Sequence, residues 1–158
     1  MDNKVTRRGF FDRAVSIGVV GLTAAGLCVC MLSGCIKKDQ TPSIPAKWLE
    51  IKKDRVVVNV KGVKALHNVG GAAKIVHPKL KEQIIVVHPS DARFLALSGL
   101  CTHRGRAVMY RHSAGELQCI NYGHSRFGLD GTPLSGPAKR ALKVYRTLYL
   151  GGKLEVFL

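Results

Sequence analysis

The residue types most able to do chemistry lie close together, between Cys101 and His124. They form two pairs, Cys101 with His103 and Cys119 with His124, and fifteen residues separate His103 from Cys119. Thiolates and imidazoles are the protein ligands that transition metals and iron–sulfur clusters take. Two cysteines and two histidines can also hold a tetrahedral zinc ion. The spacing therefore predicts a metal centre, either a redox cluster or a structural zinc site.

Short runs of β-branched and aromatic residues, bounded by turn residues, surround these pairs. Strands are predicted at 56–60, 84–87, 94–97, 107–111, 116–120, 143–150 and 153–158, with a weaker candidate at 74–77. Each ligand pair follows a strand end and is accompanied by a glycine, Gly105 or Gly123, that permits a tight loop. Gly151-Gly152 is a hairpin signal. No segment of this region has the period of a long helix, so the fold is predicted to be mainly β, a small sandwich or barrel.

The sequence around the two pairs resembles the Rieske iron–sulfur family. The family commonly reads ALS-x-x-CTH-x-G, and this chain has ALSGLCTHRG at 96–105. The family also reads S-x-F-D-x-x-G followed by GPA, and this chain has SRFGLDG at 125–131 and GPA at 136–138. The resemblance covers residues 48–158. It implies a Rieske-like antiparallel β-sandwich or barrel, with a cluster-binding subdomain of two loops and a [2Fe–2S] cluster.

In the family, one iron takes two thiolates and the other takes two imidazoles. The resemblance thus implies four cofactor ligands: Cys101, His103, Cys119 and His124. The second family motif is usually C-x-x-H-G-S, whereas this chain reads CINYGHS at 119–125. Tyr122 stands at the usual distance from Cys119, but tyrosine is a poor ligand for this cluster. The ligand is therefore assigned to His124, with Gly123 absorbing the extra length. His112, between the two pairs, is the alternative.

A Rieske cluster carries one electron, so the resemblance implies an electron-transfer subunit of an oxidoreductase. A histidine on an oxidised iron loses its proton more easily, because the metal's charge opposes the proton's. The family uses this property in quinol oxidation by cytochrome bc-type complexes, and similar carriers serve arsenite-oxidase-like periplasmic enzymes. The implied partners are a quinol-oxidising cytochrome b-type subunit or a periplasmic oxidoreductase, with a cytochrome c-type acceptor. No carboxylate pair or Ser/His/Asp set indicates an independent catalytic site.

Quinol-oxidising members usually have two further cysteines that form a disulfide between the loops. The corresponding positions here lie near Arg106 and near Ile120 or Asn121, so this disulfide cannot form. Its absence favours a reduction potential below the top of the family range of about −150 to +300 mV. The alternative function is a lipoprotein with a structural zinc site that acts as a binding module. A ring-hydroxylating oxygenase component is disfavoured, because 158 residues leave no room for its mononuclear-iron domain.

The chain is strongly basic, with a net charge of +15. Such a surface can attract nucleic acid, an anionic membrane or an acidic protein. The basic residues form no nucleic-acid motif and have few aromatic residues among them, so no nucleic-acid partner is predicted. An acidic redox partner or anionic lipid is favoured, and a simply solvated basic surface fits equally well.

Residues 1–34 are predicted to be a targeting segment. The sequence TRRGFF at 6–11 resembles a twin-arginine export signal, and an uncharged apolar run follows from Ala14 to Met31. Arg7 and Arg8 are the predicted export signal, with the ordinary positive flank of an anchor as the alternative. The twin-arginine route carries folded proteins, which suits a protein that must receive its cluster before export.

The end of the apolar run, LSGC at 32–35, resembles a bacterial lipoprotein box. Cleavage would occur before Cys35, whose thiol would carry the lipid. The alternative is an uncleaved membrane anchor, because residues 14–36 are long enough to span a bilayer. Both interpretations place a Rieske domain at 48–158 on the periplasmic face of the membrane, after a polar linker at 35–47 that contains two prolines.

Overall fold

The structure is a computed structural model that describes residues 39–121 and 123–158. The chain divides after Cys35, and the described residues belong to the second unit, Ile36–Leu158. The predicted targeting segment, with Arg7, Arg8 and the lipidation residue Cys35, lies outside the described residues. Among the residues that the structure describes, no helix is long and apolar enough to cross a membrane.

Three antiparallel sheets of four strands each make up the described fold, which confirms the predicted mainly β architecture. The first sheet has the order β1 (Leu49–Ile51), β2 (Arg55–Asn59), β12 (Lys153–Phe157), β11 (Thr147–Leu150). The second has the order β10 (Val144–Tyr145), β5 (Arg93–Ser98), β4 (Ile84–Ser90), β3 (Gly71–Ile75). The third has the order β6 (Val108–Arg111), β7 (Glu116–Cys119), β8 (Arg126–Phe127), β9 (Pro133–Ser135). Short 3₁₀ turns are η2 (Ala46–Trp48), η3 (Val60–Gly62) and η4 (Lys64–Leu66).

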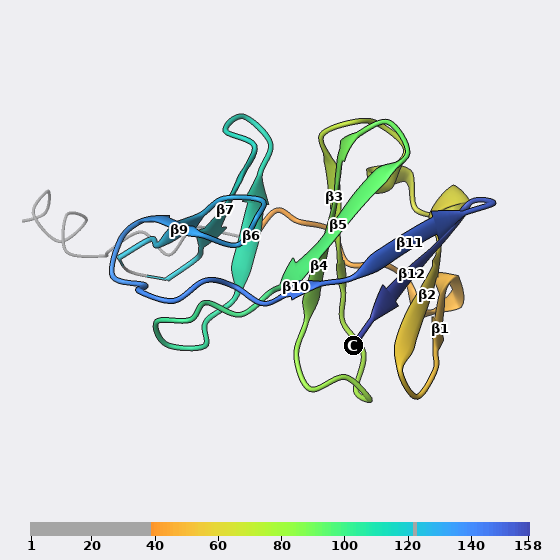
Figure 1. Cartoon of the computed structure of the whole chain (residues 1–158), viewed down its shortest axis with the longest axis horizontal. Coiled ribbons are helices and arrows are strands. Elements are labelled where there is room, and N and C mark those ends of the chain that lie inside the picture. The colour runs from red at the N-terminus through yellow and green to blue at the C-terminus, as the bar shows by residue number, and fades with distance from the viewer. Residues whose placement is uncertain (1–38, 122) are drawn as a thin grey trace, which may run out of the picture. The chain divides into compact units, whose positions relative to one another are not determined.

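The second sheet has hydrophobic clusters on both of its faces, as strand β4 shows. Side chains alternate between the two faces of a strand, so Ile84 and Val86 pack into one cluster and Ile85 and Val87 into the other. A strand covered on both faces reads as an unbroken apolar run, which explains the sequence IIVV at 84–87. The first cluster joins the second sheet to β2 and β12, and the other joins it to β6 and β7. Figure 1 shows the second sheet between the other two.

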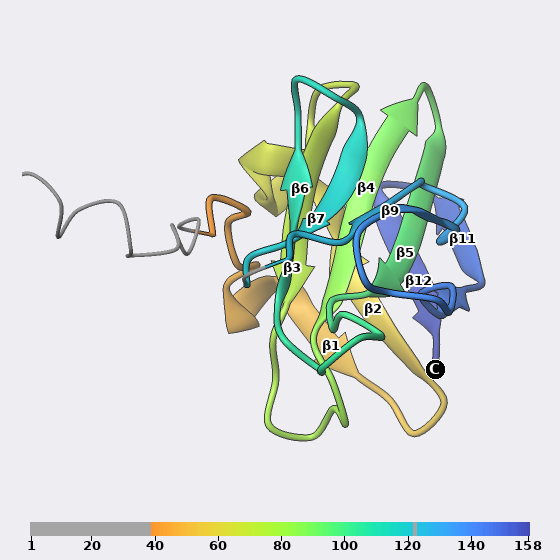
Figure 2. The same cartoon turned by 90° about the vertical axis from the view of Figure 1, so that its left-hand side faces the viewer.

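The chain before η2 is bound to the domain through residues 39–44, here called the strap. Its backbone pairs with the edge strand β3, since the Ile44 amide donates to the Lys74 carbonyl and the Lys74 amide donates to the Pro42 carbonyl, both at 2.7 Å. The hydroxyl of Thr41 accepts the Tyr110 amide of the edge strand β6 at 2.8 Å. Figure 2 shows this segment in orange beside β3. The strap therefore covers edges of both the second and the third sheet.

A buried ion pair joins the strap to β3. The Lys74 side chain is only 4% exposed, and its ammonium contacts the carboxylate of Asp39. Burial lowers the pKa of Lys74 to about 8, which shows how poorly its charge is solvated there. The carboxylate of Asp39 is the counter-charge that this buried ammonium contacts.

Removing one partner of this pair should cost more than removing both. We expect Asp39→Ala to lower the free energy of unfolding by about 2 kcal/mol, because it leaves a buried charge without a partner. Adding Lys74→Met should recover most of this loss, since an apolar side chain of similar length needs no counter-charge. Urea unfolding of the two single variants and the double variant measures the coupling. If the loss in the double variant equalled the sum of the two single losses, the ion pair would not stabilise the fold.

Candidate metal centre

Two loops and the end of β7, which carries Cys119, hold the four candidate ligands, and the third sheet places the two loops side by side. The first loop, 101–106, connects β5 to β6, and the second, 120–125, connects β7 to β8. Cys119 lies opposite Val108 in the antiparallel pairing of β6 with β7. The Ile120 amide donates to the Ala107 carbonyl at 3.1 Å, which ties the start of the second loop to the end of the first.

The first loop is closed by its own backbone. The Cys101 amide donates to the Arg106 carbonyl at 2.7 Å, and the Gly105 amide donates to the Cys101 carbonyl at 2.8 Å. Gly105 has a φ of +63°, a conformation that glycine adopts without a steric penalty. This turn buries Cys101, which is 2% exposed, and leaves His103 exposed. The thiol and the imidazole of the first pair thus differ in their access to solvent.

The second loop contains two successive left-handed residues, Gly123 with φ +91° and His124 with φ +40°. The conformation at Gly123 is the one that the sequence predicts for a loop of extra length. A histidine in this region costs about 1 kcal/mol or more, so the surrounding contacts must hold it there. The Cys119 amide donates to the Ser125 carbonyl at 2.9 Å, and His124 Nδ1 lies 3.3 Å from the Cys119 carbonyl. The loop therefore folds His124 back toward Cys119.

The two described cysteines, Cys101 and Cys119, are free, buried thiols in the same hydrophobic cluster. Burial raises the pKa of the Cys119 thiol, and its hydrogen bond with the Cys101 thiol raises it further. The Asn121 backbone and the charge of Arg106 oppose this rise. A metal binds cysteine as the thiolate and displaces these protons. Two buried thiols are the donor set that one iron of a Rieske-type cluster takes.

A single metal ion and a cluster of two irons need different numbers of protein ligands at each metal. Within residues 39–121 and 123–158, no three histidine, cysteine or acidic side chains could hold a single metal ion. In a Rieske centre each iron takes only two ligands from the protein. Cys101 and Cys119 lie in one buried cluster, and each loop also bears one histidine, His103 in the first and His124 in the second.

A third segment, which carries none of the candidate ligands, links the two loops. Residues 136–140, here called the clasp, connect the second loop to the first. The Ala138 amide donates to Oγ of the buried Ser125 at 3.1 Å. The Thr102 hydroxyl donates to the Arg140 carbonyl at 2.7 Å, and Arg140 Nη2 donates to the Thr102 carbonyl at 3.4 Å. The family motif GPA at 136–138 was the only sequence signal of this role.

The clasp depends on Gly136, which has a φ of +87°. A Cβ atom there would lie 2.6 Å from Ser125 Cα, which is too close for any real contact. We expect Gly136→Ala to lower the free energy of unfolding by about 2–3 kcal/mol, because strained backbone adds to a clash with the second loop. Chemical unfolding of the purified variant measures the loss.

Gly115→Ala is the matched control for this prediction. Gly115 also has a positive φ, +62°, but a Cβ atom there meets no atom within 4 Å. Gly115→Ala should lower the free energy of unfolding by about 1 kcal/mol, from backbone strain alone. Equal losses in the two variants would show that the contact between Gly136 and Ser125 does not matter.

The other histidines have partners away from the two cysteines. His112 lies at the β6–β7 turn, the opposite end of the hairpin from Cys119, and its Nδ1 is 2.8 Å from the Gly70 carbonyl. His88 is buried, and its Nδ1 lies 3.0 Å from the Leu66 carbonyl. It stacks on Phe94 with ring centroids 4.3 Å apart. These contacts explain His112 and His88 without a metal.

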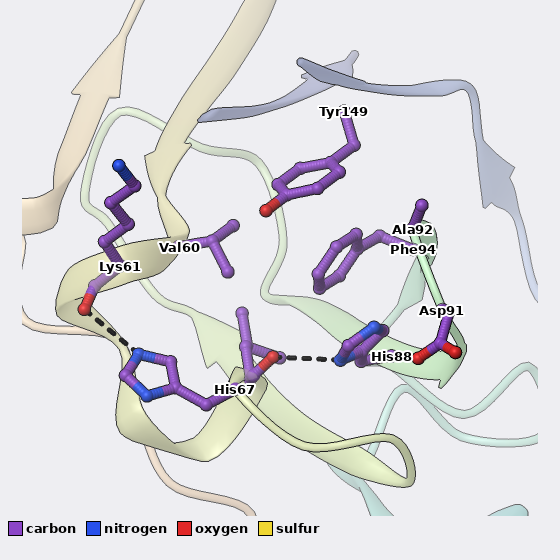
Figure 3. A pocket seen from close by; sticks show the side chains of 9 residues that line it. Val60, Lys61, His67, His88, Asp91, Ala92, Phe94 and Tyr149 are labelled. Atoms are coloured by element: carbon purple, nitrogen blue, oxygen red, sulfur yellow. Dashed lines mark hydrogen bonds between the residues drawn. The ribbon is translucent and has the colours of Figure 1, made fainter. Parts of the chain in front are cut away.

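A pocket of about 430 Å³ lies beside His88 (Figure 3). It is lined by Val60, Lys61, Leu66, His67, His88, Asp91, Ala92, Phe94 and Tyr149. His67 Nε2 lies 3.0 Å from the Lys61 carbonyl at its edge. The lining contains neither of the two described cysteines, so this pocket is separate from the candidate metal centre.

Comparison with known proteins adds independent findings. A family model described as the Rieske [2Fe-2S] domain matches residues 50–146. The chain is 26% identical over 150 residues to the cytochrome b6-f complex iron-sulfur subunit of Chlorobaculum tepidum, which covers 95% of this chain and 74% of that protein.

Two solved structures are similar as well. The ferredoxin of carbazole 1,9a-dioxygenase from Nocardioides aromaticivorans IC177 has a TM-score of 0.51 at 19% identity, covering 64% of this chain and 93% of that one. This likeness shows a shared fold. The cyanobacterial plasma membrane Rieske protein of Synechocystis PCC 6803 has a TM-score of 0.49 at 28% identity, covering 55% of this chain and 86% of that one.

Proposed function

Because this chain belongs to the Rieske [2Fe–2S] family, we propose that it is a one-electron carrier with the ligands Cys101, His103, Cys119 and His124. The family implies the [2Fe–2S] cluster, and the proposal assigns two thiolates to one iron and two imidazoles to the other. The observation that carries this assignment is that two free thiols, Cys101 in the first loop and Cys119 at the end of β7 beside the second loop, are buried in one hydrophobic cluster. Each of these loops also bears a histidine.

The residues around the centre have different tasks in this proposal. The bound cluster would supply the electron-accepting group. The buried Cys101 and Cys119 keep one side of the centre away from water, and the exposed His103 provides the path to a partner. The clasp holds the two loops at a fixed separation through Ser125 and Thr102. A fixed geometry favours electron transfer, because little reorganisation accompanies the change of charge.

We further propose that the carrier is exported and tethered to a membrane. Arg7 and Arg8 within residues 1–34 would direct export, and Cys35 would carry the lipid. Residues 48–158 would form the Rieske domain, to whose edge strands the strap within the linker at 35–47 is bound. Similarity to a cytochrome b6-f complex subunit supports a quinol-oxidising cytochrome b-type complex as partner, rather than an arsenite-oxidase-like enzyme. Arg106, at the position of a bracing cysteine in such subunits, favours a lower potential.

The test is metal analysis with low-temperature EPR on the full chain, purified anaerobically in detergent and reduced with dithionite. Two irons and two sulfides per chain, with a Rieske-type signal, are expected. Stoichiometric zinc without a signal, persisting after attempted cluster reconstitution, would contradict the electron-carrier function and indicate a structural zinc site.

A further inference from the structure

Four exposed cations lie on the first loop and on the clasp, and we propose that they dock an acidic surface of the protein that exchanges electrons with the centre. This cationic rim consists of Arg104, Arg106, Lys139 and Arg140. The proposal rests on the proposed function, since it specifies the chemistry of the redox partner of the same centre.

Hydrogen bonds connect the clasp, which bears two rim residues, to the first loop, which bears the other two and the exposed His103. Arg104 and Arg106 belong to the first loop, one on each side of Gly105. Lys139 and Arg140 belong to the clasp, which is bound to the second loop at Ala138 and to the first loop at Arg140. Lys139 therefore lies between the attachment points to the two loops.

No carboxylate in the neighbouring sequence balances these charges. Residues 99–108, 120–126 and 136–146 contain no aspartate or glutamate. The acidic group on the adjacent turn, Asp130, accepts hydrogen bonds from the amide and hydroxyl of Thr132. Arg126, which follows the second loop, forms an ion pair with Glu116. Within the described residues, the four rim cations form no ion pair. A rim of one sign raises the local concentration of oppositely charged partners.

The position of the rim favours a protein over a lipid surface. An electron carrier must bring its centre close to that of its partner. The rim residues lie next to the exposed His103 in the first loop and on the clasp that is hydrogen-bonded to Thr102. Phospholipid headgroups on these cations would cover His103 and separate the two centres. An acidic protein surface would instead bring the second redox group toward it.

The experiment compares two protein oxidants of opposite charge, acidic plastocyanin and basic cytochrome c. The full chain in detergent is reduced with dithionite, and its oxidation is followed by stopped-flow absorbance at low and high ionic strength. We expect the rate with plastocyanin to fall as salt is added and the rate with cytochrome c to rise, because salt screens attraction and repulsion alike. Arg104→Gln with Lys139→Gln should lower the plastocyanin rate about ten-fold at low salt.

Lys61→Gln with Lys64→Gln is the matched control, because it removes two exposed charges from η3 and η4. Its plastocyanin rate should equal that of the unmodified chain. Equal losses in both double variants would overturn the proposal, since only the net charge would then matter. So would rim variants that lose binding to phosphatidylglycerol vesicles yet keep the plastocyanin rate, which would indicate a lipid site. EPR of every variant comes first: a missing cluster in the unmodified chain would contradict the proposed function itself.

Discussion

We expect His124→Ala to abolish the [2Fe–2S] cluster, whereas His112→Ala leaves it intact. His124 lies in the second loop, folded back toward Cys119, with Nδ1 3.3 Å from the Cys119 carbonyl. His112 lies at the other end of the β6–β7 hairpin and contacts Gly70. An iron that loses one of its two protein ligands is open to solvent, so the cluster should be lost on purification. Iron and sulfide content with EPR amplitude measures the effect.

His103→Ala provides the positive comparison, because it removes the imidazole of the first loop. It should lose the cluster to the same extent as His124→Ala. Thermal unfolding of the variants after cluster removal separates loss of a ligand from loss of the fold. A normal Rieske-type signal in His124→Ala would overturn the assignment of this ligand. A lost signal in His112→Ala would favour His112 as the fourth ligand instead.

Phe127→Ala should cause the largest loss of stability among core substitutions near the centre. Phe127 is fully buried on β8 and packs in the same hydrophobic cluster as Cys101 and Cys119. Truncating a buried phenylalanine removes apolar contacts and leaves a cavity, so we expect a loss of about 3–5 kcal/mol. Chemical unfolding measures this loss. The cavity would lie under the ligand loops, so the EPR signal of the remaining folded protein should also broaden.

Phe94→Ala is the matched control for the effect on the centre. Phe94 is 4% exposed and belongs to the other hydrophobic cluster, which contains neither cysteine. Its loss of stability should be similar, but the EPR line shape of its folded fraction should be unchanged. Identical line shapes in the two variants would show that the packing beneath the cysteines does not influence the centre.

The longer strands could be predicted from sequence because their signal is local. The runs at 56–60, 84–87 and 94–97 correspond to β2, β4 and β5, whose β-branched and aromatic residues are buried. The Gly151-Gly152 hairpin is also confirmed, with positive φ at both residues as such a turn requires. In contrast, β8 and β9 have only two and three residues. So short a run has no periodicity, and these strands exist through pairing with β7 and with each other.

The candidate ligands could be named because few residue types bind iron, but their surroundings could not be. The clasp binds the loops through the backbone amide of Ala138 and the backbone carbonyl of Arg140. Almost any residue type can supply such groups, so the sequence does not reveal these hydrogen bonds. The division of the run 143–150 into β10 and β11, which join different sheets, also depends on tertiary pairing. Composition likewise indicates a free linker at 35–47, whereas Thr41 and Ile44 in this range are buried.

The strap also limits how far the carrier could travel. Residue 39 is bound to Lys74, and only four peptide units separate it from Cys35. A chain of that length spans at most about 14 Å when fully extended. If Cys35 carries a lipid, as proposed, this short connection would hold the domain close to the bilayer surface. Its partner would then have to present its redox group at that height, and a carrier so placed would exchange electrons with a neighbour in the same membrane rather than shuttle between distant ones.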